Sequence, residues 1–233
     1  MLLVPVSAWA YRPFVSTDAA VAEPKEVEIE VGYFNLDRNR HENAISTPHT
    51  VLNYGIAKNV ELVGEFTLQE RPDVKLTDPS LSVKAVLREG ALQDKPGVSV
   101  AVEVGPLLPS TLPHEHSVGF EAIGIVSGKL DPVTVHVNGG GGLDRAGEFF
   151  GVWGVIGELP VHPKLRLVAE VNGQSAQGVP PNNSALLGLI WQPTDKNLFL
   201  DVGIRHGISR VAPDWQFTLG LTYGFSFPTF RRQ

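Results

Sequence analysis

The stretch that decides the fold is "KEVEIEVGYF", Lys25–Phe34, where three glutamates alternate with branched apolar residues. A period of two places the carboxylates on one face of a β-strand and the apolar side chains on the other. In a soluble sheet the apolar face packs on a core and the glutamates meet water. In a membrane barrel the apolar face meets lipid and the glutamates face a wet interior. One strand leaves both arrangements open.

Composition narrows the choice. The chain has 233 residues, enough for one large β domain or two small ones, with 24 Gly, 18 Pro and no Cys. It contains no run of about 18 apolar residues, so no transmembrane helix is expected. The net charge of −6 comes without a basic stripe, so we expect no nucleic-acid partner.

The first ten residues, "MLLVPVSAWA", are apolar and end in Ala8-Trp9-Ala10, the small-x-small pattern of a signal-peptidase site. The positive n-region is missing. We therefore interpret residues 1–10 as the remnant of a signal peptide whose true start lies upstream, with a mature chain beginning at Tyr11. The alternative is a buried first strand.

The alternation continues along the chain and predicts twelve strands of about ten residues, the length that a tilted strand needs to cross a bilayer. They are expected near residues 26–37, 48–57, 60–70, 78–88, 97–105, 116–127, 132–142, 149–159, 164–173, 183–192, 197–207 and 214–227. The prediction is an all-β fold: a single antiparallel transmembrane β-barrel over residues 26–233, with both ends of the chain on one side. The least secure region is 78–95, where the apolar spacing also fits a helix.

The connections support the barrel because they differ by parity. Short turns are expected after the even-numbered strands, as at Lys58-Asn59. Polar loops are expected after the odd-numbered ones, as in "RNRHENAIST", "GPLLPSTLPHEH" and "GQSAQGVPPN". This is the outer-membrane arrangement, which a β-sandwich does not require.

Aromatic residues gather near the predicted strand ends, where membrane interfaces favour them. Trp153 is the exception, near a strand centre. The two predicted belts contain Tyr33, Tyr54, Phe150, Trp191, Trp215, Tyr223 and Phe225.

The face opposite the lipid carries mixed charge. The predicted lumen-lining residues are Glu28, Glu30, Glu61, Glu65, Lys84, Arg88, Glu103, Glu121, His136, Arg166, Glu170, Asp201 and Arg205. Such a face can line a water-filled path with a slight preference for cations, or pair its charges and stiffen the interior. Since eight strands are filled by side chains and sixteen leave a wide pore, twelve predict a narrow channel that the N-terminal segment can obstruct. A soluble β-sandwich or lipocalin-like barrel is the runner-up.

Three stretches carry a family resemblance: "RPFVSTDAAVAEP" at 12–24, "VLNYGIAKNVEL" at 51–62 and "LFLDVGIRHGIS" at 198–209. In order and spacing the chain resembles the phenol-degradation meta-pathway (MetA-pathway) type of outer-membrane protein, a group regarded as transporters. One departure is the end of the chain, where "PTFRRQ" follows Phe227 although such barrels usually finish on an aromatic residue.

The resemblance implies that residues 11–25 form a periplasmic lead-in, and that Asp201 and Arg205 belong to the signature of the penultimate strand. It also implies passage of small apolar or aromatic solutes through the cell outer membrane of a Gram-negative bacterium. The expected partners are the lipid bilayer, the solute and the barrel-assembly machinery, and no cofactor is expected. A closed barrel with a structural or loop-mediated role is the alternative.

Catalytic and metal sites are weakly indicated. A membrane lipase needs a Ser-His pair, and the chain offers His206 and Ser209 at a loop edge, without a Gly-x-Ser-x-Gly turn. His114-Glu115-His116 lacks a nearby third metal ligand. Gly139–Gly142 lacks the lysine and helix of a phosphate loop, and we interpret it as a thin patch where a loop or plug approaches the wall. We therefore expect no enzyme, and an ion network rather than a substrate site around Asp201 and Arg205.

Overall fold

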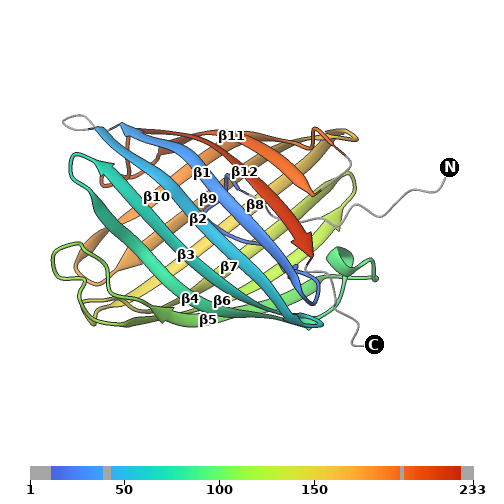
Figure 1. Cartoon of the computed structure of the whole chain (residues 1–233), viewed down its shortest axis with the longest axis horizontal. Helices are drawn as coiled ribbons and strands as arrows, with labels where there is room; N and C mark the ends of the chain where they lie inside the picture. The colour runs from blue at the N-terminus through green and yellow to red at the C-terminus, as the bar shows by residue number, and fades with distance from the viewer. Residues whose placement is uncertain (1–11, 39–42, 195–196, 227–233) are drawn as a thin grey trace, which may run out of the picture.

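The structure is a computed structural model that describes residues 12–38, 43–194 and 197–226. Its twelve antiparallel strands close into one barrel because β1 pairs with β12. Figure 1 shows the strands strongly tilted against the long axis of the barrel. The predicted all-β barrel is thus confirmed. The predicted signal-peptide remnant at residues 1–10 lies outside the described residues.

The strand bounds lie close to those that the alternation predicts. The strands are β1 (Glu26–Arg38), β2 (Asn43–Ala57), β3 (Val60–Arg71), β4 (Lys75–Arg88), β5 (Ser99–Leu107), β6 (Gly119–Leu130), β7 (Val133–Leu143), β8 (Phe149–His162), β9 (Leu165–Ala176), β10 (Val179–Trp191), β11 (Leu198–Gly207) and β12 (Trp215–Ser226). In the ambiguous 78–95 region the strand persists to Arg88, and only a short 3₁₀ turn, η1 (Ala91–Gln93), follows.

The loops sort by parity less sharply than predicted. The stretch 173–182, expected to be a loop, is mostly strand, and β9 and β10 are joined only by Gln177 and Gly178. Gly178 supplies the positive φ of 75° that this tight hairpin needs. The ten-residue connection between β4 and β5 lies at the end where the other joins are short, and it agrees with the longer join expected at 89–96.

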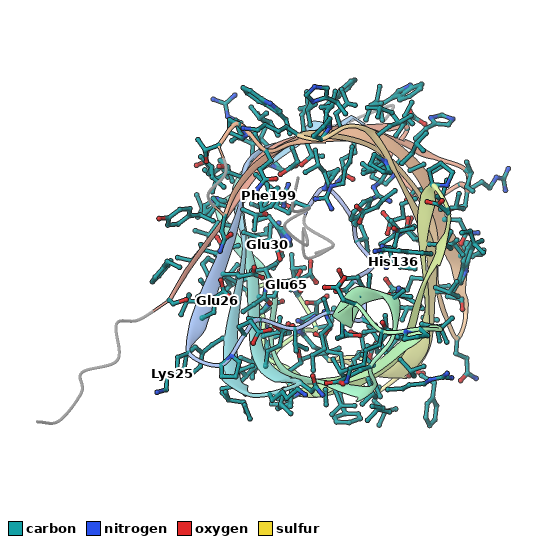
Figure 2. The ribbon with its side chains drawn as sticks, turned by 90° about the vertical axis from the view of Figure 1, so that its right-hand side faces the viewer. Lys25, Glu26, Glu30, Glu65, His136 and Phe199 are labelled. Atoms are coloured by element: carbon teal, nitrogen blue, oxygen red, sulfur yellow. The ribbon has the colours of Figure 1, made fainter. Side chains whose placement is uncertain are left out.

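Burial distinguishes the inner face of the strands from the outer face. Glu28 is only 4% exposed inside the barrel, and Leu219 and Tyr223 on neighbouring β12 are exposed on the outside. Many large apolar side chains are exposed along the middle of the strands, among them Val155, Leu187 and Val202. Figure 2 looks along the barrel and shows Glu30, Glu65, His136 and Phe199 directed inward. The apolar face is therefore the lipid face.

The aromatic belts are found only in part. Tyr54, Trp191 and Tyr223 are exposed near the turn end, and Trp215 is exposed at the opposite end. Phe225 is half-buried and stacks on Tyr223, with ring centroids 5.9 Å apart. The side chain of Tyr33 lies outside the described part of the structure.

The prediction that Phe150 belongs to an aromatic belt is wrong. Phe150 shares the inward parity of Ile156 and Glu158 on β8, whereas its neighbour Phe149 is 70% exposed. The sequence did not show which ring faces outward, because Phe149 and Phe150 are adjacent and either could take the outer face.

A charge on the outer face tests the strand parity. We expect Leu219→Arg to destabilise the folded barrel by about 2–4 kcal/mol, because Leu219 lies near the middle of β12 and a basic side chain there meets hydrocarbon. Urea unfolding in lipid vesicles, followed by heat-modifiable gel migration, measures the change. Leu219→Ala is the control, and equal stability of the two variants would mean that the parity is wrong.

Candidate functional site

The candidate site is the barrel lumen. The alternation of the strands places nearly all of the predicted lumen residues on the inner face, namely Glu28, Glu30, Glu61, Glu65, Lys84, Glu103, Glu121, His136, Arg166, Glu170, Asp201 and Arg205. Arg88 is the exception. It is exposed beyond a register shift at Val86/Arg88, and its guanidinium lies near Gly97 in the following turn.

The lumen is not empty, because the N-terminal segment (residues 12–24) runs inside it. Its backbone amides donate to carboxylates of the wall. Ala22 donates to Glu61 over 2.6 Å, and Ser16 donates to Glu170 over 2.7 Å. A segment that pairs with no strand must satisfy its amides in another way, and the inward acids supply the acceptors. The lead-in implied by the resemblance therefore turns into the barrel.

Further contacts fix the middle of the N-terminal segment. Asn138 accepts from the amide of Thr17 and donates to its carbonyl, over 3.0 and 2.7 Å. Ala19 donates its amide to Ser127, and Gln93 of η1 donates to the Ala19 carbonyl. In chain order the segment thus passes along the inner wall, from β9 at Ser16 to β7, β6 and then β3 at Ala22.

Two small apolar clusters also hold the N-terminal segment. Phe14 packs against the buried side chains Val168, Leu186, Ile190 and Phe199. Farther along, Ala19 joins Leu92, Ala101 and Ile125. The buried core of this barrel therefore includes the N-terminal segment as well as the wall.

An ion network surrounds Asp201 and Arg205. Arg205 donates to Glu170 over 2.5 Å, and also to Asn172 and Ser184. Asp201 lies 3.9 Å from the guanidinium of Arg12, which belongs to the N-terminal segment and not to a neighbouring strand. The hydroxyl of Thr218 accepts a further hydrogen bond from Arg12.

A Ser-His-Glu cluster lies on the inner wall. His136 Nδ1 lies 2.8 Å from Ser127 Oγ, and its Nε2 lies 3.4 Å from Glu158, which pairs with Arg166 over 2.9 Å. The order resembles that of a hydrolase triad. However, Ser127 and His136 are fully buried, and neither residue borders the two cavities described below. Within the cluster, Ser127 instead accepts a hydrogen bond from the Ala19 amide. The sequence analysis did not include Glu158 among the lumen residues, although it has the same inward parity as Ile156 on β8.

The other candidates do not form sites. His206 contacts the Asp214 carbonyl, whereas the hydroxyl of Ser209 accepts from the amide of Asn183, so the two are not paired with each other. In the candidate metal stretch His114-Glu115-His116, the Glu115 carboxylate accepts a hydrogen bond from the Ser110 hydroxyl and lies 3.5 Å from Arg145. Among the described residues, no group of three or more His, Cys, Asp or Glu could hold a metal ion.

The glycine run of β7 has a different neighbour from the predicted one. A Cβ on Gly140 would collide with the backbone of Ala122, and one on Gly142 would collide with that of Phe120. Both neighbours belong to β6, so the close approach is between strands of the wall rather than between the wall and a plug.

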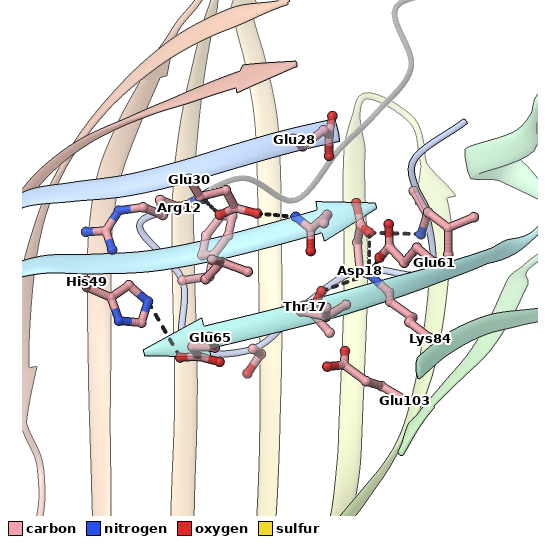
Figure 3. A pocket seen from close by; sticks show the side chains of 17 residues that line it. Arg12, Thr17, Asp18, Glu28, Glu30, His49, Glu61, Glu65, Lys84 and Glu103 are labelled. Atoms are coloured by element: carbon pink, nitrogen blue, oxygen red, sulfur yellow. Dashed lines mark hydrogen bonds and ion pairs between the residues drawn. The ribbon is translucent and has the colours of Figure 1, made fainter. Parts of the chain in front are cut away.

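Two cavities border the N-terminal segment. The inner cavity, of about 120 Å³, lies between the segment and the wall formed by β1–β5 (Figure 3). The outer cavity, of about 430 Å³, lies against the wall formed by β6–β12 and Asp78 of β4. Ser16 borders both cavities. The lining of the outer cavity is rich in side-chain amides, including those of Asn138, Asn172 and Gln216.

The inner cavity is strongly acidic. Six carboxylates border it, from Asp18, Glu28, Glu30, Glu61, Glu65 and Glu103, against the cations Arg12 and Lys84. Lys84 lies centrally, 3.6 Å from Asp18 and 3.5 Å from Glu61, and donates to Thr17. His49 lies 3.6 Å from Glu65. This lining favours cations over anions.

Comparison with known proteins bears on the fold. Neither the family models nor the curated proteins give a match. The solved COG4313 outer membrane channel from Pseudomonas putida F1 is similar, with a TM-score of 0.62 and 11% identity, over 91% of this chain and 100% of that one.

Two weaker likenesses are a loop-deletion mutant of OmpT, an outer membrane protein of Vibrio cholerae, and an anion-selective porin from Comamonas acidovorans. The first has a TM-score of 0.46 and 11% identity over 86% of this chain and 98% of that one; the second has 0.43 and 8%, over 78% and 60%.

No helix within the described ranges is long and apolar enough to cross a membrane. The strands close into a barrel whose outer face is apolar and whose inner face is charged. The first of the likenesses shares this fold. The chain therefore has the fold of an outer-membrane β-barrel.

Proposed function

We propose that the barrel is a narrow channel for small solutes, restricted by the N-terminal segment and selective for cations. The observation that carries the proposal is the pair of cavities on the two walls of the lumen, both bordered by Ser16. A solute that passes Ser16 would leave the amide-rich outer cavity and enter the acidic inner one. By the usual arrangement of outer-membrane barrels, the end with both chain termini faces the periplasm.

The resemblance to the phenol-degradation family extends the proposal to small aromatic or apolar solutes. The charged inner cavity supports passage of small polar solutes more directly, since an apolar compound gains nothing from a lining of carboxylates. Uptake of phenol and of a small sugar by vesicles containing the protein compares the two classes.

Planar-bilayer recording tests the channel itself. We expect the purified wild-type chain to give small, cation-preferring current steps. Glu65→Gln should lower the cation preference, because Glu65 borders the inner cavity and its side chain is 38% exposed. If there is no current and the vesicles stay closed to both solutes, the proposed channel is wrong.

A closed structural barrel is the second candidate, favoured by the many buried bonds that hold the N-terminal segment. Fixing the segment distinguishes the two. A Cβ on Gly154 would lie 3.0 Å from Cβ of Ser16, slightly closer than the usual disulfide separation of about 3.8 Å. A Ser16→Cys/Gly154→Cys pair should therefore be able to form a disulfide after a small adjustment.

The chain has no natural cysteine, so this disulfide would be the only one. If small movements of the segment gate the channel, oxidation should lower the open probability and reduction should restore it. Ser16→Cys alone is the control for the reductant. Identical gating in the oxidised and reduced forms would mean that the segment does not need to move.

A further inference from the structure

Glu28 has the fewest partners of the carboxylates that border the inner cavity in the described part of the chain, and Glu65 comes next, with only His49 at 3.6 Å. Glu28 is 4% exposed and borders the cavity, yet it makes no hydrogen bond or ion pair within the described part of the chain. Neighbouring acids are matched: Glu30 accepts from Asn53 and from the Arg12 amide, and Glu61 is matched by Ala22 and Lys84. A buried carboxylate without a counter-ion is ionised only at a cost, so a cation that supplied the missing partner beside Glu28 would be stabilised there.

We propose that the inner cavity is a binding site for a small organic ammonium ion, whose charge lies against Glu28 and Glu30. Two observations favour an organic cation over a bare metal ion. The acids are spread around the cavity, and none of the described His, Asp and Glu residues are grouped closely enough to chelate a metal. Apolar side chains also border it, namely Phe14, Val51 and Val63.

These two kinds of lining match the two ends of such a ligand. The ammonium group would be satisfied by carboxylate acceptors, since charge-assisted hydrogen bonds are the stronger kind. The short hydrocarbon body would lie against the apolar side chains, and Phe14 can offer its ring face to a cation. Lys84 pairs with Asp18 and Glu61, and within the described part of the chain it makes no ion pair with Glu28.

The inference deepens the proposed channel by naming a class of solute, and it rests on that proposal for access to the cavity. Isothermal titration calorimetry on the folded chain in a non-ionic detergent tests it with n-butylammonium chloride. n-Butanol serves as the neutral probe and potassium chloride as the inorganic one. We expect butylammonium to bind, butanol not to bind, and potassium to compete only at much higher concentration.

Glu28→Gln should weaken butylammonium binding roughly tenfold or more, because it removes the carboxylate that can pair with the ammonium group. Glu28→Asp should keep most of it. Glu121→Gln is the matched control, since Glu121 is an inward acid that borders the outer cavity instead. Equal affinity of the Glu28→Gln and Glu121→Gln variants, equal binding of butanol, or competition by potassium at equal concentration would overturn the inference.

Two safeguards keep the outcomes separate. If Glu28→Gln fails to fold, as judged by heat-modifiable migration, the comparison of butylammonium, butanol and potassium on the wild type still decides. Binding without conductance would sink the proposed channel and leave the site intact. Conductance without butylammonium binding would overturn the proposed site and leave the proposed channel intact.

Discussion

Replacing Glu170 by leucine is expected to lower the free energy of unfolding by about 3–5 kcal/mol, because it leaves Arg205 buried without its carboxylate partner. The pair is 2.5 Å long, and both side chains are more than nine-tenths buried. Glu170 also accepts from the amides of Val15 and Ser16, so the N-terminal segment should loosen at the same time. Urea unfolding in lipid vesicles measures the loss.

The double variant Glu170→Leu/Arg205→Met is the control. Replacing both members of a buried ion pair by apolar residues is often close to neutral, so the double variant should recover a large part of the lost stability. A double variant as unstable as Glu170→Leu alone would show that the loss comes from the contacts to Val15 and Ser16 rather than from an unpaired Arg205.

Removing residues 12–22 is expected to raise the single-channel conductance severalfold, since this segment lies inside a barrel whose strand number otherwise leaves a lumen. Planar bilayers measure the conductance, and heat-modifiable migration checks that the barrel still forms. A milder variant, Glu61→Gln, weakens one anchor, because the amide oxygen of glutamine is a poorer acceptor than a carboxylate for the N–H that Ala22 donates. It should give more frequent large openings. Unchanged conductance in a folded deletion variant would contradict a restricting segment.

The wall of the barrel could be predicted because its pattern is local. Alternation such as that from Glu26 to Val31 fixes both the strand and the side that each residue faces, and it placed Glu28, Lys84 and Glu170 on the inner face. Prediction failed where parity is ambiguous or broken. At Phe149-Phe150 either ring could face out, and at Arg88 a register shift interrupts the alternation.

The contents of the lumen could not be predicted in the same way. Residues 12–24 have no period, so the sequence gives no sign that Ser16 meets Glu170 or that Arg12 meets Asp201. These contacts join residues that are 154 or more positions apart and depend on barrel closure. The excess of inward acids was visible, but its use as a set of acceptors for backbone amides was not.

The prediction of a loop at 173–182 was wrong for another reason. The two glycines, two prolines and one asparagine of this stretch are typical of loops. However, the two prolines are accommodated at the start of β10, where the register with β9 is irregular between Val179 and Asn182. Proline is tolerated where a strand does not donate its amide, so composition alone overestimated the loop.

Modification of a single cysteine at Ser16 tests the central claim most directly, because Ser16 borders both cavities and the chain has no other cysteine. A methanethiosulfonate that carries a trimethylammonium group is added to one side of a bilayer containing the Ser16→Cys variant, and then to the other. A continuous narrow path past the N-terminal segment predicts reaction from either side, with a stepwise fall in current. A steady current in both cases, with the cysteine still unmodified, would contradict it.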